Sequence, residues 1–473
     1  MTNTPLFKVL AVVALALCCS VSAAEDTRPN IVVIMADDMG YADLGAHGCT
    51  DIFTPGLDRL AQEGVVCTSG YVTHPFCGPS RAGFITGRYQ ARFGHEVNPA
   101  FDPANPNLGL SVDQTTFVKR LQDAGYHTGG VGKWHLGAAA PFHPLNRGFD
   151  YFYGFLGGGH DYFEINLTLP VYESYKAGLI RNEKPATFDG YLTDALSHDA
   201  VAFVERSAGK DEPFFLFVAY NAPHQPLQAP EEDIERHSHI EDPRRRTYAA
   251  MVHAMDRGIG QILDALEAQG VRDDTMVVFL SDNGGPEPRP DRAGGKGNGS
   301  DNKPLRAGKG SMYEGGSRVP FLVSWPARLP AGVHYDRPVI AIDIARTAVE
   351  LAGADAGDEL EGRNIVPFLT REREGDPHDV LFWRGHNGSR FALRSGDLKL
   401  VKPSWESDKV ALFDLSADLG EKTDLASSRP DELQRLLDLW HAWNADNQRN
   451  DMLGTLPYHK RLGELYDSEL MAE

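Results

Sequence analysis

Residues 77–88 combine a nucleophilic side chain with the features of a helix start, in the order Cys-Gly-Pro-Ser-Arg-Ala-Gly-Phe-Ile-Thr-Gly-Arg. Pro79 suits the first helical turn, where its missing N–H is not needed. Ser80 can satisfy free backbone donors of the same turn. The pattern therefore predicts a short helix with Cys77 at its N-terminus, where backbone N–H groups and the helix dipole attract anions. This is the chemistry of a nucleophile held beside an anion site.

Two pairs of oxygen-bearing side chains form a second chemical feature. Each pair follows an apolar run, and the pairs are Asp37-Asp38 and Asp282-Asn283. Carboxylate and amide oxygens without a soft ligand suit a hard divalent cation, Ca²⁺ or Mg²⁺, rather than zinc. The absence of histidine from this set also disfavours a di-zinc centre. Either pair alone could serve only as a turn, but the two pairs together indicate a metal site.

Positively charged and imidazole side chains are the third chemical feature. They follow further apolar runs or lie near glycines, and they are Arg81, Lys133, His135, His224 and Lys309. Positioned cations and a metal stabilise a transition state in which negative charge builds on oxygen atoms. Each residue alone could be a solvated lysine or a hydrogen-bonded histidine. Together they predict a cationic wall around an anionic reacting group.

The fold must bring these residues together, and the chain alternates short apolar runs with helical stretches. This alternation is typical of an α/β domain with a large, mostly parallel mixed sheet flanked by helices. The expected strands cover residues 31–35, 129–131, 214–219 and 276–280, and the expected helices cover residues 55–62, 115–124, 191–207 and 248–269. Open α/β sheets bind ligands beyond the carboxyl ends of their parallel strands. We therefore expect the candidate residues to converge at one sheet edge.

The texture of the chain changes towards its C-terminal end. A long loop is expected over residues 284–310, and loops of that length are often functional. Short antiparallel strands are expected at residues 380–384, 390–393, 398–401 and 411–415, with a turn at 395–397 and a closing helix over 430–447. We predict a signal peptide over residues 1–24, a catalytic α/β domain over 25–375, and a small C-terminal antiparallel β/α subdomain over 376–473.

The N-terminal residues have the pattern of a secretory signal. Lys8 precedes an apolar run, residues 9–19, that is too short to span a bilayer, and small residues follow as a cleavage site. We predict export to the periplasm or the extracellular space and no stable membrane insertion; an N-terminal anchor is the alternative. In an oxidising compartment Cys49 and Cys67 could pair, although the strand-like surroundings of Cys67 favour a small buried hydrophobic residue there.

The charge balance excludes several classes of partner. The chain has 46 Lys and Arg against 66 Asp and Glu, which gives a net charge of −20. Nucleic acids and anionic surfaces require basic patches, so we expect neither as a partner. An anionic substrate would need positive charge focused locally in one cleft.

Residues 77–88 match the signature C-x-P-S-R-A-x-x-x-T-G-R of the formylglycine-dependent (type I) sulfatases, members of the alkaline phosphatase-like superfamily. The resemblance extends from about residue 29 to residue 425, and its other blocks are residues 36–40, 132–137, 222–226, 281–285, 308–316 and 412–415. It implies a sulfuric ester hydrolase with an alkaline phosphatase-like fold.

The resemblance also implies a modified nucleophile and a metal. A formylglycine-generating maturation enzyme would oxidise Cys77 to an aldehyde, whose hydrate attacks the sulfate sulfur and forms a covalent sulfo-enzyme intermediate. Ca²⁺, rather than Mg²⁺, would be the metal. Its ligands would be the modified Cys77 with Asp37, Asp38, Asp282 and Asn283.

The cationic wall receives individual roles from the same resemblance. Arg81 and Lys133 would hold the hydrate and the sulfate. His224 and Lys309 would contact sulfate and help to protonate the leaving alcohol. His135 would deprotonate the second hydroxyl of the hydrate, so that sulfate leaves by elimination and the aldehyde re-forms.

The substrate expected of an exported sulfatase is a sulfated carbohydrate, a poly- or oligosaccharide. Residues 92–98 resemble a stretch of secreted bacterial polysaccharide sulfatases. Candidate sugar contacts are His95, His160 and Asp161, for which loop hydrogen bonding is the alternative. Two rival functions are a phosphonate or phosphodiester hydrolase of the same superfamily and a non-catalytic protein that binds sulfated glycans.

Overall fold

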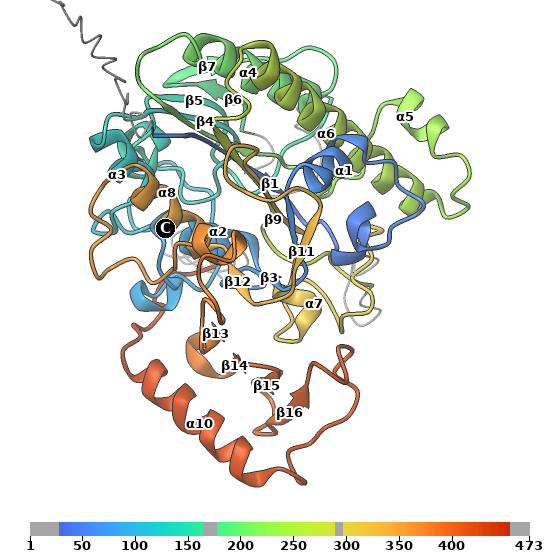
Figure 1. Ribbon diagram of the computed structural model, residues 1–473, viewed down its shortest axis with the longest axis vertical. Coiled ribbons are helices and arrows are strands. Elements are labelled where there is room, and N and C mark those ends of the chain that lie inside the picture. The colour runs from blue at the N-terminus through green and yellow to red at the C-terminus, as the bar shows by residue number, and fades with distance from the viewer. Residues whose placement is uncertain (1–27, 164–176, 289–296, 455–473) are drawn as a thin grey trace, which may run out of the picture.

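A large sheet covered by helices on both faces dominates the structure, and a second sheet lies at its C-terminal end (Figure 1). This computed structural model describes residues 28–163, 177–288 and 297–454. The predicted signal peptide, residues 1–24, lies outside the described residues.

The large sheet has ten strands. Their bounds are β1 (Asn30–Ala36), β2 (Val65–Cys67), β4 (His127–Lys133), β5 (Tyr151–Phe155), β6 (Leu179–Arg181), β7 (Lys184–Ala186), β8 (Phe214–Ala219), β9 (Thr275–Ser281), β10 (Phe321–Ser324) and β11 (Val333–Tyr335). Their order in the sheet is β11-β2-β10-β9-β1-β8-β4-β5-β6-β7. A separate parallel pair is formed by β3 (Gly70–Tyr71) and β12 (Val339–Ile340).

The central strands are parallel and end together. β1 lies between β8 and β9, and Met35 is opposite Ala219 of β8 and Leu280 of β9. β4 follows on the far side of β8, with Val131 opposite Val218. Because strands buried on both faces read as continuous apolar runs, the sequence identified β1, β8 and β9. β10 is antiparallel to β9, so the predicted mixed, mostly parallel sheet is confirmed.

The α-helices range from four residues in α7 and α9 to 26 residues in α6. The α-helices are α1 (Pro55–Gln62), α2 (Cys77–Thr86), α3 (Phe117–Asp123), α4 (Leu192–Ser207), α5 (Glu231–Arg236), α6 (Pro243–Ala268), α7 (Glu314–Ser317), α8 (Ile342–Leu351), α9 (Val366–Leu369) and α10 (Pro430–Ala445). The 3-10 helices are η1 (Tyr41–Asp43), η2 (Gly45–His47), η3 (Gln90–Phe93), η4 (Ala140–Phe142), η5 (Pro144–Arg147) and η7 (His386–Gly388).

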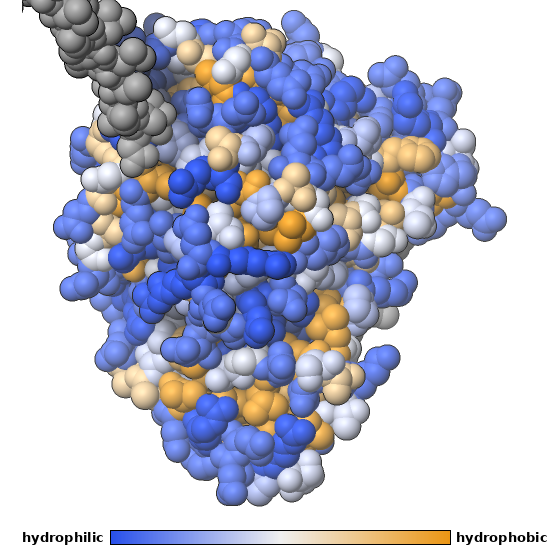
Figure 2. Space-filling view, in the orientation of Figure 1, coloured by the Kyte–Doolittle hydropathy of each residue, from blue (hydrophilic) through white to orange (hydrophobic). Residues whose placement is uncertain are grey.

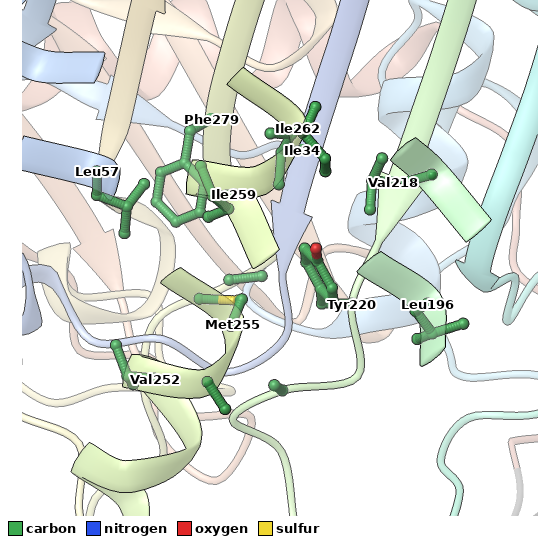
Figure 3. Close-up of a cluster of buried hydrophobic side chains, with 14 of the residues drawn as sticks. Ile34, Leu57, Leu196, Val218, Tyr220, Val252, Met255, Ile259, Ile262 and Phe279 are labelled. Atoms are coloured by element: carbon green, nitrogen blue, oxygen red, sulfur yellow. The ribbon is translucent and has the colours of Figure 1, made fainter. Parts of the chain in front are cut away.

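Side chains of β1 alternate between two cores, one on each face of the sheet. Val32 and Ile34 belong to a core that includes α1, α4 and α6, whereas Ile31 and Val33 belong to a core that includes α2, α3 and α8. Figure 3 shows part of the first core, with Ile259 of α6 beside Phe279 of β9. The two cores together fix the sheet edge on which the candidate residues lie.

Helix α6 begins five residues before the predicted start at residue 248, because a cap outweighs the apolar pattern there. Pro243 occupies the first turn, and the Asp242 side chain accepts a hydrogen bond from Arg244 N. Both features favour a helix start. Residues 243–247 contain no residue of the apolar core, which is why periodicity alone missed them.

The C-terminal sheet is antiparallel, as predicted. Its strands pair in sequence order and are β13 (Leu381–Gly385), β14 (Arg390–Ser395), β15 (Leu398–Lys402) and β16 (Ala411–Asp414). Helix α10 covers it, and Trp440 stacks on Phe391 with ring centroids 4.3 Å apart. In the described residues of the long loop 284–310, no helix or strand occurs.

The described cysteines are all free thiols. Cys67 is fully buried in β2, which confirms its predicted role as a small hydrophobic residue, and Cys49 is not paired with it. None of the helices described here combines the length and the hydropathy required to cross a bilayer. The face in Figure 2 is largely hydrophilic, with hydrophobic residues in separate patches.

Candidate active site

Cys77 is the first residue of α2, as the sequence predicted, and it is 1% exposed. Asn98 Oδ1 accepts a hydrogen bond from Gly78 N at 2.8 Å, which satisfies one of the free donors at this helix start. A Cβ on Gly78 would lie 2.9 Å from Asn98 Oδ1, so glycine permits the close approach. Ser80 Oγ has no hydrogen-bond partner among the described residues. The capping expected of Ser80 therefore comes from Asn98 instead.

Two lysines connect the acidic pair to the rest of the site. Lys309 Nζ donates to Cys77 Sγ at 3.1 Å and to Asp38 Oδ1 at 2.6 Å. Lys133, the last residue of β4, donates through Nζ to Asp37 Oδ2 at 2.6 Å. Residues from β4, α2, the turn after β1 and the loop before α7 thus converge at one edge of the sheet.

Arg81 and Asp282 form a buried ion pair beside them. Arg81 Nε and Nη2 both lie 2.9 Å from Asp282 Oδ2, and Arg81 Nη1 donates to Lys133 O at 3.2 Å. Asp282 Oδ1 accepts a hydrogen bond from Asp38 N at 3.3 Å. Both carboxylate oxygens of Asp282 therefore face donors at the end of β9.

The electrostatics of the two buried aspartates differ. Burial and the neighbouring Asp37 raise the pKa of Asp282 to about 6, although Arg81 opposes the shift. Burial also acts to raise the pKa of Asp37, but Lys133 and His224 outweigh it and hold that pKa well below its usual range. Clustered carboxylates of this kind remain ionised only beside compensating positive charge.

Two buried oxygen atoms of the cluster have no hydrogen-bond partner in the described part of the chain, and they are Asp37 Oδ1 and Asn283 Oδ1. Asn283 directs its Nδ2 to Asp38 Oδ1 at 2.7 Å, which leaves its amide oxygen for another group. An unsatisfied buried oxygen is costly, and hard cations bind such oxygens. The residues present therefore fit a Ca²⁺ or Mg²⁺ ion.

His224 lies closer to the acidic cluster than the sequence suggested. One ligand atom from each of Asp37, Asp38, Cys77 and His224 lies within 4.8 Å of the others, and His224 Nε2 is 3.5 Å from Asp38 Oδ2. Burial lowers the pKa of His224 although Asp37 and Asp38 raise it. The sequence assigned His224 to the cationic wall, and its geometry adds it to the residues around the metal position.

His135 occupies a strained backbone position at the end of β4. Its φ is 59°, a left-handed conformation that non-glycine residues seldom adopt, and its Nδ1 is buried without a hydrogen-bond partner in the described residues. A Cβ on Gly158 would lie 2.6 Å from His135 Nε2, so glycine gives the ring its space. Burial, Lys133 and Arg81 hold the pKa of His135 well below its usual value. A neutral imidazole here can accept a proton.

The candidate sugar contacts are all buried: His95, His160 and Asp161 are 2%, 0% and 5% exposed. The Asp161 carboxylate accepts hydrogen bonds from Phe163 N and Gln228 Nε2, and His160 Nδ1 lies 2.7 Å from Asp161 O. The contacts of His160 and Asp161 agree with loop hydrogen bonding, whereas His95 Nε2 has no hydrogen-bond partner among the described residues. A role in sugar binding stays a prediction for all three.

Asn298 is a residue of the site that the sequence did not identify. It is fully buried, and its Nδ2 donates to Asp38 O at 3.3 Å and to Pro223 O at 3.4 Å. It therefore joins the turns that carry Asp38 and His224. It lies in a glycine-rich loop without periodicity, so only its amide side chain could have drawn attention to it.

The comparisons with known proteins agree with this geometry. The family model described as Sulfatase matches residues 29–354, and the model described as N-sulphoglucosamine sulphohydrolase, C-terminal, matches residues 307–439. The N-acetylgalactosamine-6-sulfatase of Canis lupus familiaris is 33% identical over 81% of this chain and 73% of its own.

Solved structures share the fold. Ps i-CgsB, solved in complex with k-i-k-neocarrahexaose, superimposes with a TM-score of 0.83 at 39% identity and covers 92% of this chain and 97% of its own. The phosphonate monoester hydrolase of Agrobacterium radiobacter has a TM-score of 0.62 at 20% identity, with coverage of 88% and 96%. That identity shows a common fold only.

Proposed function

This chain belongs to the sulfatase family and is a sulfuric ester hydrolase, and from that premise we propose that it removes sulfate from a sulfated poly- or oligosaccharide through a formylglycine made from Cys77. The main support is the position of Lys309, whose Nζ contacts both Cys77 Sγ and Asp38 Oδ1. This places a helix-start nucleophile, a cation and a metal-type carboxylate around one point.

In the proposed reaction the residues around Cys77 act in successive steps. In the hydrate of the aldehyde two hydroxyl groups would be bonded to Cβ of residue 77, and Cys77 Sγ marks the place that one of them would take. An oxygen of the hydrate forms a bond to the sulfate sulfur, and the bond from sulfur to the sugar oxygen breaks. The attacking hydroxyl loses its proton and the departing sugar oxygen gains one, and Lys309 and His224 assist this net transfer. Arg81 and Lys133 hold the sulfate oxygens, on which charge accumulates.

Release of sulfate depends on His135 in this proposal. His135 is neutral because burial lowers its pKa, so it can take a proton from the second hydroxyl of the hydrate. The carbon–oxygen bond to sulfate then breaks, sulfate leaves with the bonding electrons, and the aldehyde re-forms. Water restores the hydrate for the next turnover.

We also propose Ca²⁺ as the metal, bound by the modified Cys77 with Asp37, Asp38, Asp282 and Asn283. The ion supplies positive charge beside the reacting sulfate. The two unpartnered oxygens, on Asp37 and Asn283, support this assignment.

Addition of Ca²⁺ to metal-free protein is expected to stabilise the fold. The unpartnered oxygens are brought together only in the folded state, so Ca²⁺ should bind that state and stabilise it. A ligand present at a hundred times its dissociation constant adds about 2.7 kcal/mol to the free energy of unfolding. Thermal unfolding with and without Ca²⁺ measures this. Asn283→Leu should remove most of the Ca²⁺-dependent shift, while the control Asn107→Leu, at an exposed position outside the cluster, should retain it. An equal shift in both variants would contradict the assignment.

Maturation, export and domain organisation complete the proposal. A formylglycine-generating enzyme would act on Cys77, and residues 1–24 would direct export to the periplasm or the extracellular space. We retain residues 25–375 as the catalytic domain and 376–473 as the C-terminal subdomain. Because Ps i-CgsB was solved in complex with k-i-k-neocarrahexaose, this oligosaccharide is the first compound to test as a substrate.

Release of sulfate from a glycan by the matured protein tests the proposal directly. We expect turnover of at least one member of a panel of sulfated oligosaccharides that includes neocarrahexaose, and slower turnover of an aryl phosphonate ester than of an aryl sulfate ester. A clear preference for the phosphonate would favour the rival hydrolase. Retention of the glycan without sulfate release would favour a non-catalytic binding protein.

A further inference from the structure

A pocket of about 260 Å³ lies where the C-terminal sheet meets the start of α2. The catalytic domain contributes Phe76, Glu96 and Gly310, and the C-terminal subdomain contributes His386, Arg390 and Trp405. None of the last three residues belongs to a motif recognised in the sequence. The volume is below the range typical of drug-sized ligands, so the pocket suits one sugar ring rather than a longer segment.

The pocket adjoins the reaction centre on two sides. Phe76 immediately precedes Cys77, and Gly310 immediately follows Lys309. Gly310 has a φ of 82°, and a Cβ there would lie 2.7 Å from the Phe76 ring, so glycine brings these two walls into contact. The pocket is thus lined by the residues that directly flank the two side chains meeting at the proposed nucleophile.

Its chemistry suits a sugar with polar or anionic substituents. The Trp405 side chain is large and apolar, yet the residue is 50% exposed, and an exposed indole face can stack on the C–H face of a sugar. His386 and Arg390 contact the indole. The His386 ring centroid is 4.9 Å from that of Trp405, and Arg390 Cζ lies over the Trp405 ring, 5.2 Å from its centroid. The planar guanidinium group binds oxyanions well.

The acidic wall of the pocket does not oppose an anionic ligand. Glu96 Oε1 lies 2.7 Å from Arg384 Nη1, and Glu96 Oε2 accepts a hydrogen bond from Asn387 N at 2.7 Å. The carboxylate is therefore compensated within the protein. Arg390 Nη1 donates a hydrogen bond to Gly310 O at 3.1 Å. This bond joins the basic side of the pocket to the loop that carries Lys309.

We propose that this pocket is a sugar subsite, in which Trp405 stacks on the residue next to the one that carries the scissile sulfate, with the polar substituents of that residue at His386 and Arg390. The proposal rests on the proposed function, because it names part of the substrate-binding surface of the same site. It gives the C-terminal subdomain a role in substrate selection.

Binding of neocarrahexaose to full-length Cys77→Ala protein tests the subsite without turnover. We expect Trp405→Ala in this background to weaken binding about tenfold in calorimetry, a loss within the range for one stacking side chain. Phe53→Ala is the matched control, because Phe53 is 46% exposed and does not line the pocket. It should bind as the parent does.

The substrate selectivity of the matured enzyme gives a second readout. The ratio of kcat/KM on the hexasaccharide to kcat/KM on an aryl sulfate, which has no neighbouring sugar, should fall about tenfold in Trp405→Ala and stay unchanged in Phe53→Ala. Equal affinity of Trp405→Ala and its parent, or no binding by the parent, would overturn the subsite. Failure of the proposed function is separate, since it appears as an absence of sulfate release by the unsubstituted protein.

Discussion

Replacement of Cys77 by alanine is expected to lower kcat/KM for sulfate release by about a thousandfold or more, the scale seen when an enzymatic nucleophile is removed. The free energy of unfolding should change by only about 1 kcal/mol, because the lost side chain is small. Steady-state kinetics and thermal unfolding of the same preparation measure the two effects. The proposed reaction has no other residue that can carry the hydrate, which is why the expected loss is large.

The same residue allows a chemical test of maturation. Trypsin should release residues 60–81 as one peptide, which contains both Cys67 and Cys77. In active enzyme, mass analysis should find an aldehyde at Cys77 and an alkylatable thiol at Cys67, which is buried in β2. Cys67→Ala is the matched control and should retain turnover. Full activity from protein in which both positions remain thiols would refute the mechanism.

Some parts of the site followed from sequence because strand pairing is strongly encoded. The continuous apolar runs of β1, β8 and β9 identified a parallel sheet, and its carboxyl edge then predicted that Asp37, Lys133 and Asp282 would meet. Their contacts with neighbouring charges agree with that reasoning. Such a prediction needs only that the strands are parallel members of one sheet, because their carboxyl ends then lie at the same edge.

Other parts depend on loop conformation, which has no period to detect. Asn298 and Asn98 act through hydrogen bonds from or to backbone groups of other segments, and nothing in their sequence neighbours predicts that geometry. Trp405 reaches the edge of the site only because the C-terminal sheet packs against the loop after Lys309. Contacts between two sheets are set by tertiary packing, so the sequence pattern of either one does not reveal them.

That packing includes a fully buried charge network. Lys399 of β15 places its Nζ 2.7 Å from Glu314 Oε1 and 3.4 Å from Glu421 Oε1, and all three side chains are 0% exposed. Glu314 is the first residue of α7 and also accepts a hydrogen bond from Tyr71 Oη at 2.7 Å. Burial acts to raise the pKa of Glu314, but Lys399 and Arg318 lower it to about 2. Lys399 and Arg318, whose Nη1 lies 3.2 Å from Glu314 Oε2, therefore keep this carboxylate ionised between the two sheets.

Lys399→Met is expected to destabilise the protein by about 3 kcal/mol or more, the cost of leaving a buried charge without its partner. Lys402→Met on the same strand is the control. Lys402 pairs with the fully exposed Asp408, so its loss should cost about 1 kcal/mol at most. Denaturant unfolding at neutral pH measures both. Equal effects of the two substitutions would show that the buried network contributes no more than a surface pair.

The pH dependence separates loss of charge from loss of packing. In the unsubstituted protein the folded-state pKa of Glu314 lies below its usual value of 4.5, so its contribution to stability is present above pH 4.5 and is lost as the pH falls. Lys399 also faces Glu421, whose pKa burial raises to about 7 although Lys399 lowers it. Without Lys399 the pKa values of Glu314 and Glu421 both rise, so the lost stabilisation grows as the pH rises and these carboxyl groups ionise. The deficit of Lys399→Met should therefore be larger at pH 8 than at pH 5, where protonation relieves the buried charge. A deficit independent of pH would mean that Lys399 acts through its aliphatic chain, and the charge network would not be what joins the two sheets.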